Sequence, residues 1–273
     1  MRGTALEEVL RRDRLVVAGA LFVLAALAWS YVLWLAADMD MSGMDMGGSR
    51  MIPSGLGAMV PRFSPWSGME FALVFAMWAV MMIGMMTPSA APMILIFARV
   101  GRQAAIAEKP FASASWFAAG YFLAWTGFAL IATAAEWVLD RAALLDPAMA
   151  ITSKMLGGIL LIAAGLYQWS RPKDVCLAKC QSPILFIQQQ GGFRRDVAGA
   201  LLLGLRHGAY CIGCCWVLMA LLFVGGVMNV LWIAVLALLV LLEKLAPIGR
   251  LIARLAGIVL VTGGAWLLLS GTS

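Results

Sequence analysis

Long apolar stretches, separated by short charged segments, occupy most of this chain. Hydrophobic residues make up 63% of its 273 residues and charged residues 12%, whereas a soluble domain is about half apolar and a quarter charged. A membrane-crossing helix needs about 20 apolar residues. Seven candidate spans follow: Leu15–Ala37, Met69–Phe97, Ser113–Val138, Thr152–Trp169, His207–Val227, Asn229–Leu242 and Leu251–Ser270. The sequence therefore predicts an all-α, polytopic transmembrane helix bundle of six or seven spans, with no room for a separate soluble domain.

The basic residues predict how this bundle is oriented. Sixteen of the twenty Lys and Arg residues fall in the N-terminus, in the segments 98–112, 170–206 and 243–250, and at Arg254. Cytoplasmic loops carry the excess of Lys and Arg, so these segments are expected to face the cytoplasm, as is the N-terminus. With seven spans the C-terminus lies outside. The first apolar stretch exceeds the 7–15-residue core of a signal peptide and is expected to stay as an anchor.

Three regions follow from this topology. Residues 1–37 are expected to form the cytoplasmic N-terminus and the first span, residues 38–68 an extracytoplasmic Met-rich loop, and residues 69–273 a metal-binding transmembrane domain. The segment Asp196–Arg206 is ambiguous, being either a cytoplasmic amphipathic helix or the start of the fifth span. Because an unpaired Arg in mid-membrane is costly, Arg206 and His207 are expected near the cytoplasmic headgroups or in a wet cavity.

A cluster of metal-ligating residue types lies in the string HGAYCIGCCW. It contains the only histidine of the chain and three of its five cysteines: His207, Cys211, Cys214 and Cys215. At helical spacing all four project into an arc of about 100°. Cys176 and Cys180 form a C-x3-C pair in the preceding cytoplasmic segment. Thiolate and imidazole are ligands that soft transition metals prefer, so these six residues are predicted to bind a metal, or alternatively to form a redox site.

Methionines form two further groups of soft ligands. In the string DMDMSGMDMG, Met39, Met41, Met44 and Met46 alternate with aspartates and small residues. Thioethers bind Cu(I) and form no disulfides in an oxidising compartment, so this segment is interpreted as a copper-capture loop; the alternative is a disordered linker. In the second span, methionines at helical spacing are interpreted either as a copper path or as packing residues: Met77, Met81, Met82, Met85, Met86 and Met93. Pro88 and Pro92 are expected to break this helix.

Acidic residues are rare in the apolar stretches, and intramembrane carboxylates are expensive. Glu136 in the third span and Glu243 beside Lys244 in the sixth are therefore candidate functional residues, each close enough to an interface to be solvated. Glu70, at the outer mouth of the second span, is a candidate for a metal-uptake site.

Several strings resemble a bacterial family of predicted metal-binding integral membrane proteins. They read WAVMMIGMMTPSAAPMILIF, GYFLAWTGFALIATAAEW, CLAKCQSPILF, GLRHGAYCIGCCWVLMALLFVGGVMN and LLVLLEKLAP, and the resemblance covers residues 69–260. The Cys pair, His207, the CIGCC cysteines and Glu243-Lys244 coincide with the family's motifs. The resemblance implies metal binding in the bacterial inner (cytoplasmic) membrane.

The leading hypothesis is a membrane protein that handles Cu(I), taking it up, transferring it or delivering it through Met and Cys/His ligands. The alternatives are a membrane thiol-disulfide oxidoreductase using Cys211 and Cys214, and a scaffold that binds copper or zinc without transport; zinc uses the same residue types. No nucleotide-binding loop is present, and no catalytic residue is assigned. The expected partners are membrane lipid, an extracytoplasmic copper donor protein and a second copy of the chain, with no nucleic acid.

Overall fold

The computed structural model describes residues 3–45, 66–108, 111–146, 149–193 and 195–270. Over these ranges the regular structure is helical, which confirms the predicted all-α bundle, and one isolated bridge joins Leu145 to Ile151. The helices are α1 (Gly3–Asp45), α2 (Gly68–Ile106), α3 (Ala114–Arg141), α4 (Lys154–Tyr167), α5 (Arg171–Gln181), α6 (Pro183–Gln189), α7 (Val197–Ala220), α8 (Leu222–Gly225), α9 (Val230–Leu245) and α10 (Gly249–Ser270).

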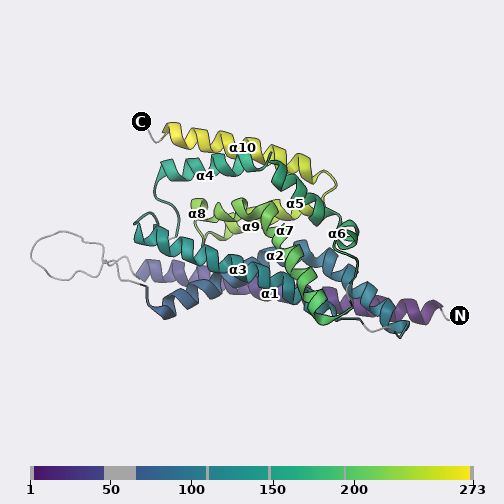
Figure 1. Cartoon of the computed structure of the whole chain (residues 1–273). Coiled ribbons are helices and arrows are strands. Elements are labelled where there is room, and N and C mark those ends of the chain that lie inside the picture. Colours follow the sequence, from purple (N-terminus) through teal and green to yellow (C-terminus); the bar gives the residue numbers. More distant parts are fainter. Residues whose placement is uncertain (1–2, 46–65, 109–110, 147–148, 194, 271–273) are drawn as a thin grey trace, which may run out of the picture.

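The helices are arranged in layers (Figure 1). α4 and α10 form a pair at one edge, α1, α2 and α3 lie at the opposite edge, and α7, α8 and α9 lie between them. α7 packs along α3 on one side and receives the short helix α5 on the other. This central position of α7 places the residues of the HGAYCIGCCW string in the core.

Among the described residues, five stretches are long and apolar enough to cross a membrane: Leu15–Ala37, Gly68–Ala104, Ala114–Arg141, Val197–Gly225 and Gly249–Ser270. The other two predicted spans correspond to α4, with 14 residues, and α9, with 16. At 1.5 Å per residue these helices are about 21 and 24 Å long, short of the roughly 30 Å hydrocarbon core. Both are ended locally, because Ser170 caps a new helix after α4 and Pro247 follows α9.

Three local expectations change with the structure. α2 continues without interruption through Pro88 and Pro92, so the predicted break is absent from this helix. α7 begins directly after Asp196, whose carboxylate accepts a hydrogen bond of 2.8 Å from the Gly199 amide. Such an N-cap fixes the start of a helix, so Asp196–Arg206 belongs to the long helix of the cysteine cluster. α1 extends through Asp45, so residues 38–45 are helical rather than a loop.

Glycines allow the closest helix contacts. A Cβ atom on Gly204 of α7 would collide with the Phe117 carbonyl of α3, and one on Gly120 of α3 would collide with the Leu201 carbonyl of α7. Small residues at such crossings let helix backbones approach each other. Gly225-Gly226 and Asn229 predict a tight turn between the fifth and sixth spans, and the structure confirms it, because Gly226 has a φ of +93° and Asn229 caps α9.

Candidate metal centre

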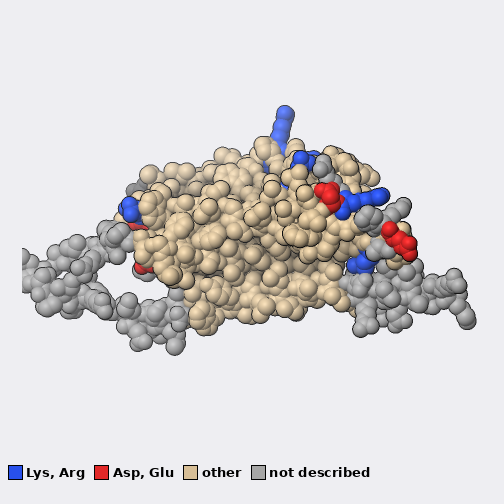
Figure 2. Space-filling view, turned by 60° about the horizontal axis from the view of Figure 1, so that its bottom comes forward, with Lys and Arg blue, Asp and Glu red and all other residues tan. Residues whose placement is uncertain are grey.

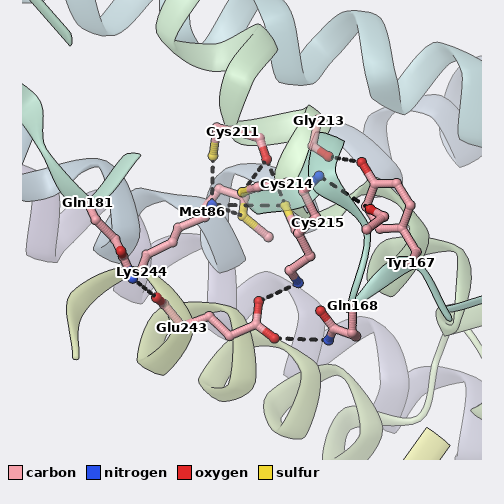
Figure 3. Close-up of polar contacts among 12 residues, drawn as sticks. Met86, Tyr167, Gln168, Gln181, Cys211, Gly213, Cys214, Cys215, Glu243 and Lys244 are labelled. Carbon is pink, nitrogen blue, oxygen red and sulfur yellow. Dashed lines mark hydrogen bonds and ion pairs between the residues drawn. The ribbon is translucent and has the colours of Figure 1, made fainter. Parts of the chain in front are cut away.

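α7 buries the whole predicted cluster. His207, Cys211, Cys214 and Cys215 are all inaccessible or nearly so, and they face the neighbouring helices α2, α3, α5 and α9 rather than the outside of the bundle. Cys214 and Cys215 each donate a hydrogen bond of 3.0 Å to the Cys211 carbonyl (Figure 3). One turn of a single helix therefore holds three sulfur atoms at the centre of the bundle.

α3 adds a polar group to this turn. The Tyr121 hydroxyl lies 3.0 Å from Cys211 Sγ and donates to the Met86 carbonyl at 3.4 Å. The close packing of Gly204 of α7 against Phe117 of α3 makes this contact possible. Phe117 lies one turn before Tyr121 on α3, and Gly204 lies two turns before Cys211 on α7. Tyr121 therefore links the methionine face of α2 to the cysteine turn of α7.

Lys244 of α9 places its ammonium group among the sulfur atoms (Figure 3). Its Nζ lies 2.7 Å from Cys211 Sγ, 3.9 Å from Cys215 Sγ and 3.9 Å from Met86 Sδ, and it donates to Ser89 Oγ at 3.4 Å. The residue is only 4% exposed. Three sulfur atoms from two helices therefore converge on one position, and a cation lies there.

The methionines of α2 face inward. Six of them are buried: Met77, Met81, Met82, Met85, Met86 and Met93. Met69, in the first turn of the same helix, is 70% exposed. Because the helix is continuous, the buried methionines from Met77 to Met86 lie along one stretch of α2 that reaches the cysteine turn. Met86 is the member of this stretch that contacts Lys244.

α5 brings the C-x3-C pair to the other side of α7. Ser170 caps α5, which packs against α7, and a Cβ atom on Gly213 would lie 2.9 Å from Cys176 Sγ. Burial raises the pKa of the Cys176 thiol. Hydrogen bonds with Cys211 and Cys214, together with burial, raise the pKa of the Cys180 thiol well above its ordinary value. Cys180 therefore joins the cysteine turn directly, whereas Cys176 lies at its edge.

His207 lies one turn before Cys211 in an aromatic environment. Its ring centroid is 5.2 Å from that of Phe186, 5.7 Å from Tyr121 and 6.0 Å from Phe117. Its Nδ1 atom is buried without a hydrogen-bond partner. The expected solvated position is thus wrong for His207, whereas Arg206 is exposed and donates to Gln190. A buried nitrogen without a partner is a rare and costly arrangement, and it suits a residue that acquires a partner by binding a ligand.

Within the described ranges, no three His, Cys, Asp or Glu side chains are already arranged around a common point to hold a metal ion. None of the five cysteines forms a disulfide. The thiols of Cys214 and Cys215 point to the Cys211 carbonyl, as neutral thiol donors do. Metal binding by the predicted Cys and His residues therefore stays a prediction, and it requires the thiol groups to rotate. The sulfur atoms that do converge on one position, around Lys244 Nζ, include that of Met86.

The two candidate carboxylates are buried rather than solvated. Glu136 is 1% exposed, and its Oε2 accepts a hydrogen bond of 2.5 Å from Trp78 Nε1. Glu243 is also 1% exposed; it forms an ion pair of 2.7 Å with Lys173 of α5 and accepts 2.9 Å from Gln168 Nε2. The neighbour in sequence, Lys244, points instead to the sulfur atoms. Glu243 therefore holds α5 against α9 beside the sulfur cluster and has a structural role there.

The methionine segment that follows the first predicted span is only partly described. Met39, Met41 and Met44 lie in the last turns of α1, and Met46 lies outside the described residues. Glu70 accepts a hydrogen bond from the Ser67 amide at 2.6 Å, and the Ser67 hydroxyl accepts one from the Glu70 amide at 3.2 Å. This reciprocal pair is a capping box, so Ser67 and Glu70 together cap the N-terminus of α2.

A surface hollow of about 220 Å³ lies between α5 and α6. It is lined by Val175, Ala178, Lys179, Ser182, Leu185, Phe186 and Gln189. The Phe186 ring lines this hollow and also contacts His207. Phe186 therefore lies beside both the hollow and the histidine of the buried cluster.

Sequence reasoning assigned no role to three residues of the site. Tyr121, Lys173 and Lys244 all contact residues that the sequence singled out. A usable signal existed for Lys244, because a lysine in the apolar string LLVLLEKLAP is costly unless it has a buried partner. Thiolate sulfur is such a partner.

The described part of the chain is thus an all-helical bundle with long apolar helices, and cysteine and methionine sulfur atoms converge in its core. Residues 75–267, more than half of the chain, match the family model PpoB2, described as a copper chaperone. The chain therefore belongs to this copper chaperone family. Comparison with curated proteins and with solved structures gave no match.

Proposed function

We propose that this protein is an integral membrane copper chaperone that binds Cu(I) through sulfur atoms of α2 and α7 and delivers it to another protein. The observation that carries the proposal is the convergence of Cys211, Cys215 and Met86 on the position of the Lys244 ammonium. Thiolate and thioether sulfur select Cu(I) among biological metals. Family membership supports the metal and the role.

The surface supports a membrane location. The broad tan area of the face in Figure 2 carries no charged side chains, and the charged ones lie at its left end, along its upper edge and towards its right end. Large apolar residues of the candidate spans point outward, among them Phe22, Leu123 and Trp266. Because a soluble monomer rarely exposes so large an apolar surface, lipid is the partner that fits it. The excess of basic residues on one side supports a cytoplasmic N-terminus.

A copper path follows from the order of the ligands. We propose that the buried methionines of α2 pass Cu(I) inward and that Cys211 and Cys215 receive it, because thiolate is the stronger ligand. Cys180 of α5 contacts Cys211 and Cys214, and His207 lies one turn before Cys211, so Cys180, Cys214 and His207 would form the next position. From there the hollow between α5 and α6 is reached past Phe186.

The test is copper bound per purified protein. The protein is produced in cells supplied with copper, purified in detergent under reducing, oxygen-free conditions, and its metal content is measured by mass spectrometry. We expect close to one copper per chain in the wild type and a loss of that copper in the double variant Cys211→Ser, Cys215→Ser.

Met69→Leu is the matched control, because it removes an exposed sulfur of α2 and is expected to keep the metal. Wild-type protein that takes up no copper, or a double variant that keeps it, would refute the proposal. Loss of copper from both the double variant and the control would show that the loss does not report on these cysteines.

A further inference from the structure

Lys244 provides a positive charge at the centre of the sulfur cluster, and nothing in the proposed function requires one. A buried ammonium is costly unless it is paired. Lys244 has no carboxylate partner within the described part of the chain; its contacts are the Cys211, Cys215 and Met86 sulfur atoms and the Ser89 hydroxyl. Its shortest contact is the one of 2.7 Å to Cys211 Sγ.

The other buried cation of this region does not supply charge to the sulfur atoms. Lys173 forms its ion pair with Glu243 at 2.7 Å, and both side chains are almost fully buried. The two charges cancel each other. Among the residues that the structure describes, Lys244 is therefore the cation in contact with the cysteine turn that has no carboxylate partner.

The charge of a loaded site follows from these contacts. Metal-bound cysteines are thiolates, so Cys211 and Cys215 contribute two negative charges and the Met86 thioether contributes none. A monovalent ion together with the Lys244 ammonium balances these two charges. A divalent ion at the same ligands leaves one positive charge in excess. Buried charge without a partner is strongly disfavoured, so this arrangement favours Cu(I) over Zn(II).

We propose that Lys244 is a specificity-determining residue that makes the sulfur site selective for monovalent over divalent soft metal ions. The inference rests on the proposed function, because it assigns Met86, Cys211 and Cys215 as the ligands. In the metal-free protein the ammonium lies between these atoms. When Cu(I) binds, the ammonium moves aside and keeps the loaded site neutral, with the Ser89 hydroxyl as a neighbouring acceptor at 3.4 Å.

The test compares two metals of different charge in matched variants. Lys244→Leu removes the charge without adding a ligand, and Lys244→Arg keeps the charge. Lys154→Leu removes the same charge from an exposed position at the start of α4 and serves as the control. Affinities of the purified full chain for Cu(I) and Zn(II) are measured by competition with chromophoric chelators of each ion, without oxygen. Circular dichroism and gel filtration establish that each variant is folded.

We expect the preference for Cu(I) over Zn(II), expressed as the ratio of the two dissociation constants, to fall at least about tenfold in Lys244→Leu. The ratio should stay within about threefold of wild type in Lys244→Arg and Lys154→Leu. An unchanged ratio in folded Lys244→Leu overturns the inference, as does a tighter preference for Cu(I). If Lys244→Leu does not fold, Lys244→Gln replaces it under the same criteria.

A wild-type measurement separates this inference from the proposed function. Wild-type protein should bind Ag(I), a monovalent soft ion, and should bind Cd(II), a divalent soft ion, at least about a hundredfold more weakly. Comparable affinities would overturn the inference with no variant involved. Wild-type protein that binds neither Cu(I) nor Ag(I) would instead refute the proposed function itself.

Discussion

The buried ion pair between Lys173 and Glu243 offers a strong test of how α5 is held against the bundle. Glu243→Gln keeps the size of the side chain and removes its charge, so Lys173 stays buried without a partner. Removing one member of a buried ion pair costs about 3–5 kcal/mol. Neither side chain is more than 2% exposed, so solvent screening does not reduce this figure. At about 2–4 °C per kcal/mol for a chain of this size, the melting temperature should fall by roughly 10 °C.

The assay is thermal unfolding of the detergent-solubilised protein, followed by circular dichroism. Glu108→Gln, an exposed carboxylate at the end of α2, is the matched control and should leave the melting temperature unchanged. The double variant Lys173→Met, Glu243→Leu removes both charges and should recover most of the loss, because two apolar residues replace a buried pair at little cost. A Glu243→Gln variant as stable as wild type, or a double variant less stable than the single one, would refute the reasoning.

Three further changes have defined outcomes. Gly204→Ala, whose added methyl group would collide with the Phe117 carbonyl, should lower both the melting temperature and copper retention by separating α3 from α7, whereas Gly127→Ala, with open space around it, should do neither; equal effects would contradict this packing. Tyr121→Phe removes the hydroxyl that contacts Cys211 and should lower the free energy of unfolding by about 1 kcal/mol, and a neutral result in chemical denaturation would exclude that bond. Trp78→Phe leaves the Glu136 carboxyl without its donor and should cost about 1–3 kcal/mol in the same assay; no loss would mean that Glu136 finds another partner.

Much of this architecture was predictable from the sequence because it depends on local pattern. Apolar length predicts the long helices, and the spacing of His207, Cys211, Cys214 and Cys215 predicts that they share one buried helix face. Gly226 and Asn229 predict a turn that the structure confirms. The start of α7 depends on the Asp196 cap, a local signal that was present but was outweighed by the cost of Arg206.

The remaining features depend on contacts between distant segments, which no local pattern encodes. Glu243 and Lys244 are adjacent in sequence, which suggests an ion pair between them. Neighbouring residues on a helix, however, point about 100° apart. Glu243 therefore contacts Lys173, and Lys244 contacts the cysteine turn. The two prolines of α2 were expected to break a helix, but the surrounding bundle holds it continuous. Tyr121 contacts Cys211 because α3 and α7 pack closely at Gly120 and Gly204, which no local pattern encodes.

X-ray absorption at the copper edge of the Cu(I)-loaded protein tests the central claim most directly, since it reports the atoms bound to the metal. We expect a first coordination shell of sulfur alone, supplied by Cys211, Cys215 and Met86. A shell made mainly of nitrogen or oxygen would place copper elsewhere and contradict a sulfur site at the centre of the bundle.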